Sequence, residues 1–211
     1  MLNNTSVDAQ NTDKILKEFK VGDKLLQKVN TAITIYGSAR TKRNNKYYDI
    51  TRDICEKLAG NGFDIISGGG PGIMQAANEG AFMHPEVKSV ALGIKLPFET
   101  SLNQYHNLGY TFKYFFTRKV MMVKYSVGYV IMPGGVGTLD ELFETLTLIQ
   151  TSKNGKGKVY LIGVEYYEGL LTWMKNHMLE DGYISEDDLD MIVLTDDIDM
   201  VVKELTTKFI N

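Results

Sequence analysis

The sequence predicts an α/β protein, a single doubly wound, Rossmann-like domain whose mostly parallel sheet is flanked by helices. Short apolar runs typical of buried strands alternate along the chain with amphipathic stretches typical of helices. Three of these runs end in turns rich in glycine and serine, as strands do when they lead into a helix. The 211 residues, 44% of them hydrophobic, suffice for one α/β domain with a sizeable core.

The first half of the chain alternates helices and strands three times. A polar opening segment rich in Asn and Thr predicts a disordered tail, with the domain over 13–211. Apolar residues at helical spacing, followed by Gly60-Asn61-Gly62, predict a helix that ends at those glycines. In chain order we expect a tail over 1–12, a helix over 13–29, a strand over 32–36, a helix over 47–59, a strand over 63–66, a helix over 73–82 and a strand over 89–94.

The second half continues the pattern after a polar and aromatic stretch over 95–111, which we expect to be an irregular loop. A long ordered loop inside a compact domain is usually functional. Apolar residues at helical spacing after a glycine-rich turn predict a helix that reaches Ile149. In chain order we further expect a helix over 118–124, a strand over 129–131, the helix over 139–149, a solvated loop over 153–158, a strand over 159–162, a helix over 166–179, a strand over 191–194 and a helix over 196–209.

Composition and charge exclude several classes of function. The net charge of −3 gives no support for nucleic-acid binding, which usually shows a basic face. The single cysteine, Cys55, allows no intrachain disulfide and favours a cytoplasmic protein. We expect no signal peptide and no membrane span, because no apolar run approaches ~18 residues. The three histidines are scattered without ligand-like spacing, so we expect no metal and no cofactor.

Three glycine turns at strand ends favour a phosphate-bearing ligand: Gly37-Ser38, the turn over 68–72 and the turn over 134–138. Each alone is compatible with a simple tight turn, but three at the carboxyl ends of one sheet favour a ligand there. No Gly-Lys-Ser/Thr follows any of them, and the glycines do not form G-x-G-x-x-G. Dinucleotide binding is therefore disfavoured, and a mononucleotide or a sugar phosphate is expected.

The third turn joins a strand to a helix N-terminus, which makes an anion site. Two acids, Asp140 and Glu141, follow in what we expect to be the first helical turn, where a pure phosphate cradle needs no carboxylate. The acids therefore suggest chemistry on the group attached to the phosphate. A structural alternative is a capping box with Thr138 at the N-cap and Glu141 at N3. Spacing alone does not exclude Asp140 as the functional carboxylate.

Arg118 and Lys119 follow the apolar segment over 114–117. They are compatible with a solvated helix face. A guanidinium beside a buried aromatic segment, however, needs a partner, because an unpaired buried charge is costly. A phosphate or a carboxylate would serve.

Three segments resemble the LONELY GUY (LOG) family: Ser-Gly-Gly-Gly-Pro-Gly-Ile-Met over 67–74, Phe-Thr-Arg-Lys over 116–119 and Pro-Gly-Gly-Val-Gly-Thr-Leu-Asp-Glu over 133–141. Members of this family are cytokinin riboside 5′-monophosphate phosphoribohydrolases, many first labelled "possible lysine decarboxylase". The resemblance covers about residues 30–195 and is specific, because the second and third segments occur together at this separation. It looks like the longer bacterial subgroup.

The resemblance implies hydrolysis of the N-glycosidic bond of an N6-substituted adenosine 5′-monophosphate, giving a free base and ribose 5-phosphate. The matching catalytic pair is Arg118 and Glu141. The positions that the resemblance implies for the substrate and phosphate site are Ser38, Gly69, Gly70, Gly72, Glu99, Lys119, Gly134, Gly135, Gly137, Thr138 and Thr147. The resemblance further implies a homodimer or a larger homo-oligomer. Two alternatives stay open: a broad nucleotide 5′-monophosphate nucleosidase acting on AMP, and a nucleotide-binding or carrier module without catalysis.

Overall fold

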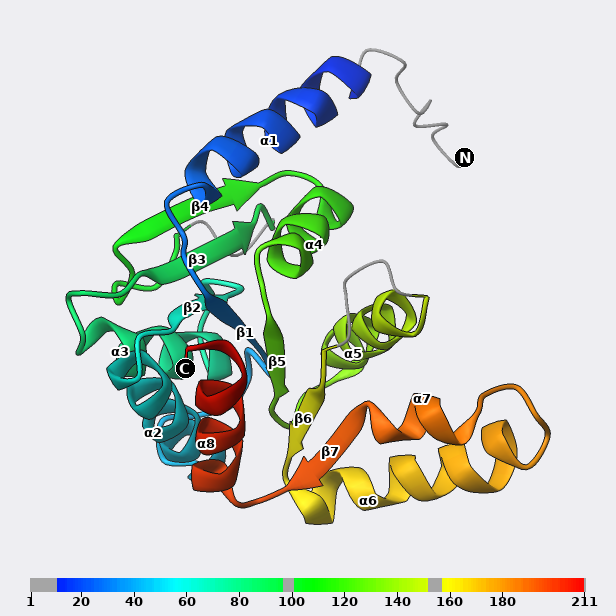
Figure 1. Ribbon diagram of the computed structural model, residues 1–211. Coiled ribbons are helices and arrows are strands. Elements are labelled where there is room, and N and C mark those ends of the chain that lie inside the picture. The colour runs from blue at the N-terminus through cyan, green and yellow to red at the C-terminus, as the bar shows by residue number, and fades with distance from the viewer. Residues whose placement is uncertain (1–10, 97–100, 152–156, 211) are drawn as a thin grey trace.

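The protein is an α/β structure with one parallel, seven-stranded sheet between two layers of helices (Figure 1). The computed structural model describes residues 11–96, 101–151 and 157–210. The strand order is β4-β3-β2-β1-β5-β6-β7, and every neighbouring pair is parallel. The strands are β1 (Ala32–Tyr36), β2 (Asp64–Ser67), β3 (Ser89–Ile94), β4 (Leu108–Phe112), β5 (Gly128–Ile131), β6 (Val159–Ile162) and β7 (Ile192–Thr195). The fold class predicted from the sequence is confirmed.

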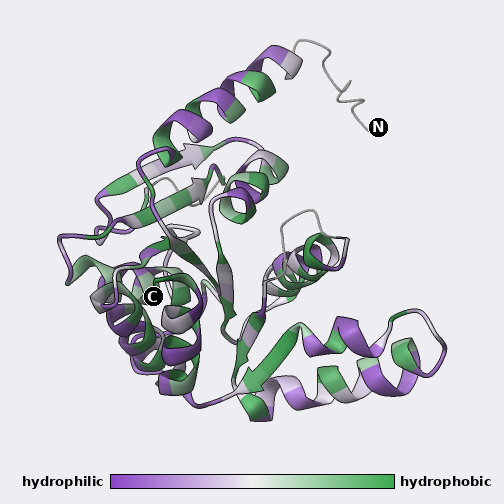
Figure 2. Cartoon of the chain, viewed as in Figure 1, coloured by the Kyte–Doolittle hydropathy of each residue, from purple (hydrophilic) through white to green (hydrophobic). Residues whose placement is uncertain are grey.

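The helices cover both faces of the sheet. They are α1 (Asn11–Leu26), α2 (Lys46–Gly60), α3 (Ile73–Phe82), α4 (Phe115–Lys124), α5 (Val136–Gln150), α6 (Val164–Trp173) with a π-helical continuation over Met174–Leu179, α7 (Glu186–Asp190) and α8 (Ile198–Phe209). One hydrophobic cluster joins α2, α3 and α8 to one face of the sheet, and a second joins α1, α4, α5 and α6 to the other. In Figure 2 helix α1 alternates hydrophobic and hydrophilic residues along its length, as an amphipathic helix does.

The central strand β1 is buried on both faces, which explains its predominantly apolar sequence. Ile33 and Ile35 belong to the cluster under α2 and α3, whereas Ala32 and Tyr36 belong to the cluster under α4 and α5. Side chains of a strand alternate between its faces. Thr34 is the polar member, and its hydroxyl lies 2.5 Å from the hydroxyl of Ser126 within the core.

The topological switch of the sheet lies between β1 and β5. From β1 the chain proceeds in one direction through β2, β3 and β4, and β5 then begins the other half on the opposite side of β1. The loops after β1 and β5 therefore diverge to different faces and leave a crevice at the carboxyl ends, where ligands of such folds bind. Two of the three predicted glycine turns follow these two strands.

Several expected elements differ from the structure. The stretch expected to be a loop over 95–111 contains most of β4, an edge strand in which Gly109 and exposed Thr111 obscure the strand pattern. The expected helix over 166–179 begins earlier, at Val164, and becomes π-helical at Met174. Helix α7 was not predicted, although Ser185 and Asp188 form a capping box at its start. Helix α1 begins at Asn11, inside the tail expected over 1–12, and residues 1–10 lie outside the described residues.

Candidate functional site

A cavity of about 650 Å³ opens at the carboxyl ends of the strands, next to the topological switch. This volume lies within the range of small-ligand sites. Its lining includes residues of all three predicted glycine turns: Gly37, Ser38, Gly68, Gly69, Gly70, Gly135, Gly137 and Thr138. The three turns therefore lie around one cavity. Helices α4 and α5 supply the charged side chains.

The N-terminus of α5 faces this cavity without a side-chain cap. Gly135 is the N-cap residue, and no side chain accepts a hydrogen bond from the first turn. The alternative of a capping box at Thr138 is wrong, because the N-cap residue, Gly135, lies three residues before Thr138. For the same reason Glu141 lies in the second helical turn. The Thr138 N–H donates to Gly135 O at 3.0 Å, so the first-turn N–H groups that remain available to an anion are those of Val136 and Gly137.

Two of the predicted glycines shape the site from behind. A Cβ at Gly72, whose φ is +66°, would overlap the carbonyl oxygen of Ser38, and a Cβ at Gly134 would overlap Thr138. Ser38 ties the turns together, since its N–H donates to Pro133 O at 3.2 Å and its carbonyl accepts from Ile73 N at 3.0 Å. Gly72 and Gly134 do not line the cavity themselves. They allow the loops around it to approach closely.

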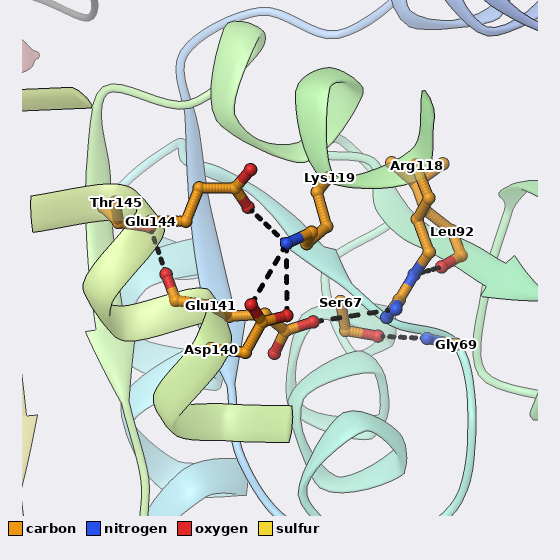
Figure 3. Close-up of polar contacts among 9 residues, drawn as sticks. All are labelled: Ser67, Gly69, Leu92, Arg118, Lys119, Asp140, Glu141, Glu144 and Thr145. Carbon is orange, nitrogen blue, oxygen red and sulfur yellow. Dashed lines mark hydrogen bonds and ion pairs between the residues drawn. The ribbon is translucent and has the colours of Figure 1, made fainter. Parts of the chain in front are cut away.

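Arg118 projects from α4 into the cavity and is 7% exposed. Its Nε–H donates to the carbonyl oxygen of Leu92 at the end of β3 at 2.7 Å. Its Nη1 lies 3.6 Å from Oε1 of Glu141 (Figure 3). A Cβ at Gly68 would overlap the guanidinium, so only glycine leaves room for it. The partner expected for this buried cation is therefore a carboxylate.

Burial raises the pKa of Glu141 to about 7, and the Arg118 guanidinium pulls that pKa downward against it. Asp140 and Glu144 raise this pKa further, whereas Lys119 lowers it. The carboxyl is thus poised near neutral pH, as catalytic acids and bases often are.

Lys119 lines the cavity, but its amine is held by two carboxylates of α5. Nζ lies 3.1 Å from Asp140 Oδ2 and 3.0 Å from Glu144 Oε2. Burial disfavours the charge of Lys119, but the bonds to Glu144 and Asp140 outweigh it and raise the pKa. The structure therefore gives Asp140 a role as an anchor for Lys119, while Glu141 turns toward Arg118 (Figure 3).

The structure does not bring Thr147, a predicted site residue, to the cavity. Thr147 is exposed on α5, and its hydroxyl donates to Phe143 O at 2.8 Å. Glu99 lies outside the described residues. Sequence reasoning also missed Arg40, an exposed lining residue whose backbone N–H donates to Ser38 Oγ at 3.0 Å. A cation two residues after a Gly-Ser turn was the signal that would have found it.

The apolar end of the cavity lies beyond Arg118, toward β3 and β4. Leu102 lines this end and packs on Gly69, Gly93 and Gly109, since a Cβ on any of the three would meet its methyl groups. Ile94, Leu96 and Met74 complete the apolar wall. Two of these residues, Leu96 and Leu102, come from the stretch over 95–111, which the sequence indicated as functional without specifying side chains.

Among the described residues, no group of three or more His, Cys, Asp and Glu side chains is placed to hold a metal ion. The same residues contain no helix long and apolar enough to cross a membrane.

Comparison with known proteins identifies relatives that match large parts of the chain. A family model described as "Possible lysine decarboxylase" matches residues 74–205. A probable cytokinin riboside 5′-monophosphate phosphoribohydrolase of Oryza sativa subsp. japonica is 31% identical over 66% of this chain and 66% of its own length. A cytokinin riboside 5′-monophosphate phosphoribohydrolase of Arabidopsis thaliana is 29% identical over 80% of this chain and 78% of its own length. For the enzyme of that name from Mycobacterium tuberculosis, the match is 35% identical and spans 38% of this chain and 43% of that protein.

Solved structures share the fold at low sequence identity. The molybdenum cofactor carrier protein of Chlamydomonas reinhardtii has a TM-score of 0.60 at 17% identity, covering 86% of this chain and 100% of that one. DNA processing protein A of Helicobacter pylori has a TM-score of 0.55 at 18% identity, covering 88% and 84%. These likenesses concern the fold alone. Because the family model spans more than half of the chain and includes both α4 and α5, the chain belongs to the possible lysine decarboxylase family, the LOG family that its motifs resemble.

Proposed function

We propose that this protein hydrolyses the N-glycosidic bond of a nucleoside 5′-monophosphate, adenosine monophosphate or its N6-substituted forms, to a free base and ribose 5-phosphate. One observation carries the proposal: a buried carboxyl, Glu141, faces a buried guanidinium, Arg118, directly beside an uncapped helix N-terminus. The relatives named as cytokinin riboside 5′-monophosphate phosphoribohydrolases support the reaction type.

The order of groups across the sheet fits a nucleotide laid over the strand ends. The uncapped helix N-terminus follows β5, the Glu141–Arg118 pair faces the ends of β1 and β2, and the apolar end lies over β3 and β4. Adjacent strands are about 4.8 Å apart. The helix N-terminus, the Glu141–Arg118 pair and the apolar end of the cavity therefore follow one another at intervals of one or two strands. A phosphate at Gly135, Gly137 and Thr138 places the ribose at Glu141 and the base toward Leu102.

The chemistry assigns different tasks to the two charged groups. Breaking a ribosyl–base bond builds positive charge on the ribose, as in glycoside hydrolysis. The Glu141 carboxylate stabilises that charge and orients the attacking water. A guanidinium is a hydrogen-bond donor and not a general acid or base in proteins, so Arg118 holds the geometry and the charge of the carboxylate. Arg40, Ser38 and the first-turn N–H groups of α5 bind the phosphate, which supplies energy for positioning the reacting bond.

The cavity does not fit the chemistry in the family model's description. Amino-acid decarboxylation through pyridoxal phosphate needs a lysine amine free to form a Schiff base. Among the described residues that line the cavity, the only lysine is Lys119, and Asp140 and Glu144 hold its amine.

We further propose that the chain forms a homodimer through the outer face of α4. Phe115, Phe116 and Val120 are exposed there, and Val136 at the start of α5 is 85% exposed. Phe115 and Val136 also line the cavity mouth. A second copy seated on this face would bury the apolar side chains and narrow the entrance.

The experiment incubates the purified protein with AMP and with N6-isopentenyladenosine 5′-monophosphate and measures free base and ribose 5-phosphate by chromatography. We expect base release that falls by about 10²–10⁴-fold in Glu141→Gln, because the variant removes the group that acts on the ribose. Asp140→Asn is the matched control, since its carboxylate anchors Lys119. The ratio of the two rates separates a cytokinin-type enzyme from a broad nucleosidase. Tight nucleotide binding without any base release would instead support a carrier module.

A further inference from the structure

A carboxylate from α1 caps the N-terminus of α4. Glu18 is 9% exposed, and its Oε1 accepts the N–H of Lys113 at 2.5 Å. Its Oε2 accepts the N–H of Tyr114 at 3.4 Å and the hydroxyl of Thr117 at 2.8 Å. The N-cap residue of α4, Tyr114, makes no side-chain cap of its own. A carboxylate at this end satisfies otherwise orphaned donors and complements the helix dipole.

The capped turn is the one from which Arg118 projects. Thr117, which contacts Glu18, directly precedes Arg118, and the Arg118 N–H donates to Tyr114 O at 3.3 Å. Thr117 Oγ1 also lies 2.8 Å from the same carbonyl oxygen, so its single hydroxyl proton is shared between this oxygen and Glu18 Oε2. The side chain of Arg118 must then reach both Leu92 O and Glu141 from this turn. A small rotation of the turn displaces the guanidinium from both partners.

Helix α1 packs closely against its neighbours, so Glu18 can hold the first turn of α4 in place. A Cβ at Gly22 would lie 3.0 Å from Phe112 Cζ and 3.1 Å from Met121 Cγ, so the helix backbone approaches its neighbours closely. At the other end of α4, Asp23 pairs with Lys124 and accepts the Tyr125 hydroxyl at 2.7 Å. Helix α1 thus contacts both ends of α4. It lies outside residues 74–205, where the family model matches.

We propose that Glu18 is a positioning residue for Arg118, acting through the first turn of α4. The effect on turnover rests on the proposed hydrolase function, whereas the effect on the position of Arg118 does not.

The test compares two acid-to-amide variants on the same helix. Glu18→Gln keeps the shape of the side chain but turns an amide NH₂ toward backbone N–H groups, which repels donors from donors. Asp23→Asn is the matched control, because it weakens the tie at the far end of α4. Thr117→Val removes the same contact from the other partner and serves if Glu18→Gln folds poorly, as checked by circular dichroism.

The first readout is the pKa of Glu141, measured by NMR on protein with ¹³C-labelled glutamate and assigned with Glu141→Gln. The charged groups that face Glu141 are Arg118 and Lys119 from α4 and Asp140 and Glu144 from α5, with the Tyr36 phenol from β1. Of these, Arg118 makes the largest downward contribution to this pKa. Its displacement therefore raises the Glu141 pKa, which a purely structural role of Glu18 would leave unchanged. The second readout is kcat and KM for AMP.

We expect Glu18→Gln to raise the Glu141 pKa and to lower kcat by about tenfold with little change in KM, since a misplacement of about 1 Å can cost up to 10²-fold. Asp23→Asn should change neither. The proposal is overturned if both variants lower only the melting temperature, or if both shift the Glu141 pKa equally. A wild-type protein that releases no base would refute the proposed hydrolase, while the NMR titration would still decide the role of Glu18.

Discussion

At the scale of single residues, the site depends on the contact between two buried groups, the Glu141 carboxyl and the Arg118 guanidinium. The sequence motifs indicated both residues, and the need of the cation for a partner followed from the apolar segment before it. The motifs did not show that Arg118 is also fixed by a backbone carbonyl of β3. That bond joins residues far apart in the chain, which local sequence patterns do not encode.

The raised pKa of Glu141 makes stability depend on pH. The folded protein holds a proton on this carboxyl up to about pH 7, whereas the ordinary value is 4.5. The contribution of Glu141 to the free energy of unfolding is therefore fully present below pH 4.5, the ordinary pKa, and is lost as pH rises through the folded pKa of about 7. We expect Glu141→Gln to be more stable than wild type at pH 8 by on the order of 3 kcal/mol, with the difference vanishing near pH 4.5. Urea unfolding across this range measures it, and a difference independent of pH would contradict the burial of the charge.

The position of Arg118 also makes Gly68 sensitive to a single methyl group. A Cβ there would overlap the guanidinium and the sulfur of Met74. Because both are the far ends of flexible side chains, we expect Gly68→Ala to fold but to lose about 10–10²-fold in kcat/KM. Gly169→Ala is the control, since its Cβ meets nothing within 4 Å in α6, and it should stabilise the helix by about 1 kcal/mol. Equal activity of both variants would exclude this steric role.

At the scale of elements, a buried amide connects α3 to its neighbours. Asn78 is fully buried, and its Oδ1 accepts from Ser67 Oγ at 2.6 Å and Asn103 Nδ2 at 2.9 Å. Its Nδ2 donates to Ser89 Oγ at 3.0 Å and to Val90 O at 3.1 Å. The side chain of α3 thereby fixes the ends of β2 and β3 and the loop that carries Leu102.

We expect Asn78→Leu, which keeps the side-chain volume, to cost about 3 kcal/mol because it leaves several buried polar groups unpaired. The variant should also raise KM for the nucleotide, because the glycine turn over 68–72, which follows β2, would be held less firmly. Asn61→Leu is the matched control on an exposed amide, whose Nδ2 donates only to Lys57 O among the described contacts, and it should stay within about 0.5 kcal/mol. Equal losses of stability in the two variants would argue against the buried network.

Elements with strong local patterns were predicted closely, and those governed by tertiary contacts were not. The ranges of β1 and α3 agree with the prediction to the residue, because a predominantly apolar run defines β1 and a glycine turn marks the start of α3. β4 was missed because its pattern is weak and its strand character depends on pairing with β3. The start of α5 was misplaced because Thr138 matches a capping residue, whereas the backbone turns into helix at Gly135.

At the scale of the whole molecule, the cavity opens beside an apolar surface on α4. Phe116 is 46% exposed, and its ring lies 6.4 Å from that of Phe19 and 5.6 Å from that of Tyr114. The sequence showed these aromatic residues but did not distinguish core packing from a surface, since both are apolar. The structure makes the distinction for each side chain.

We expect Phe116→Glu to shift the protein from dimer to monomer, because a charge replaces apolar area at the centre of the proposed interface. Light scattering coupled to size-exclusion chromatography measures the mass. Tyr183→Glu is the control, since Tyr183 is 75% exposed and lies between the π-helical continuation of α6 and α7, outside the proposed interface. A wild-type protein that runs as a monomer at all concentrations would refute the interface.

The contacts of Glu18 and Asp23 with the two ends of α4 have a consequence during synthesis of the chain. The hydrogen bonds of Glu18 and Asp23 join residues 95 to 102 positions apart. At elongation rates of about 5–20 residues per second, α1 waits on the order of 5–20 s for its partner helix to be made. During that interval its apolar side has no docking surface and is open to chaperones. Because α1 is synthesised well before α4, which carries Arg118, the site assembles late in synthesis.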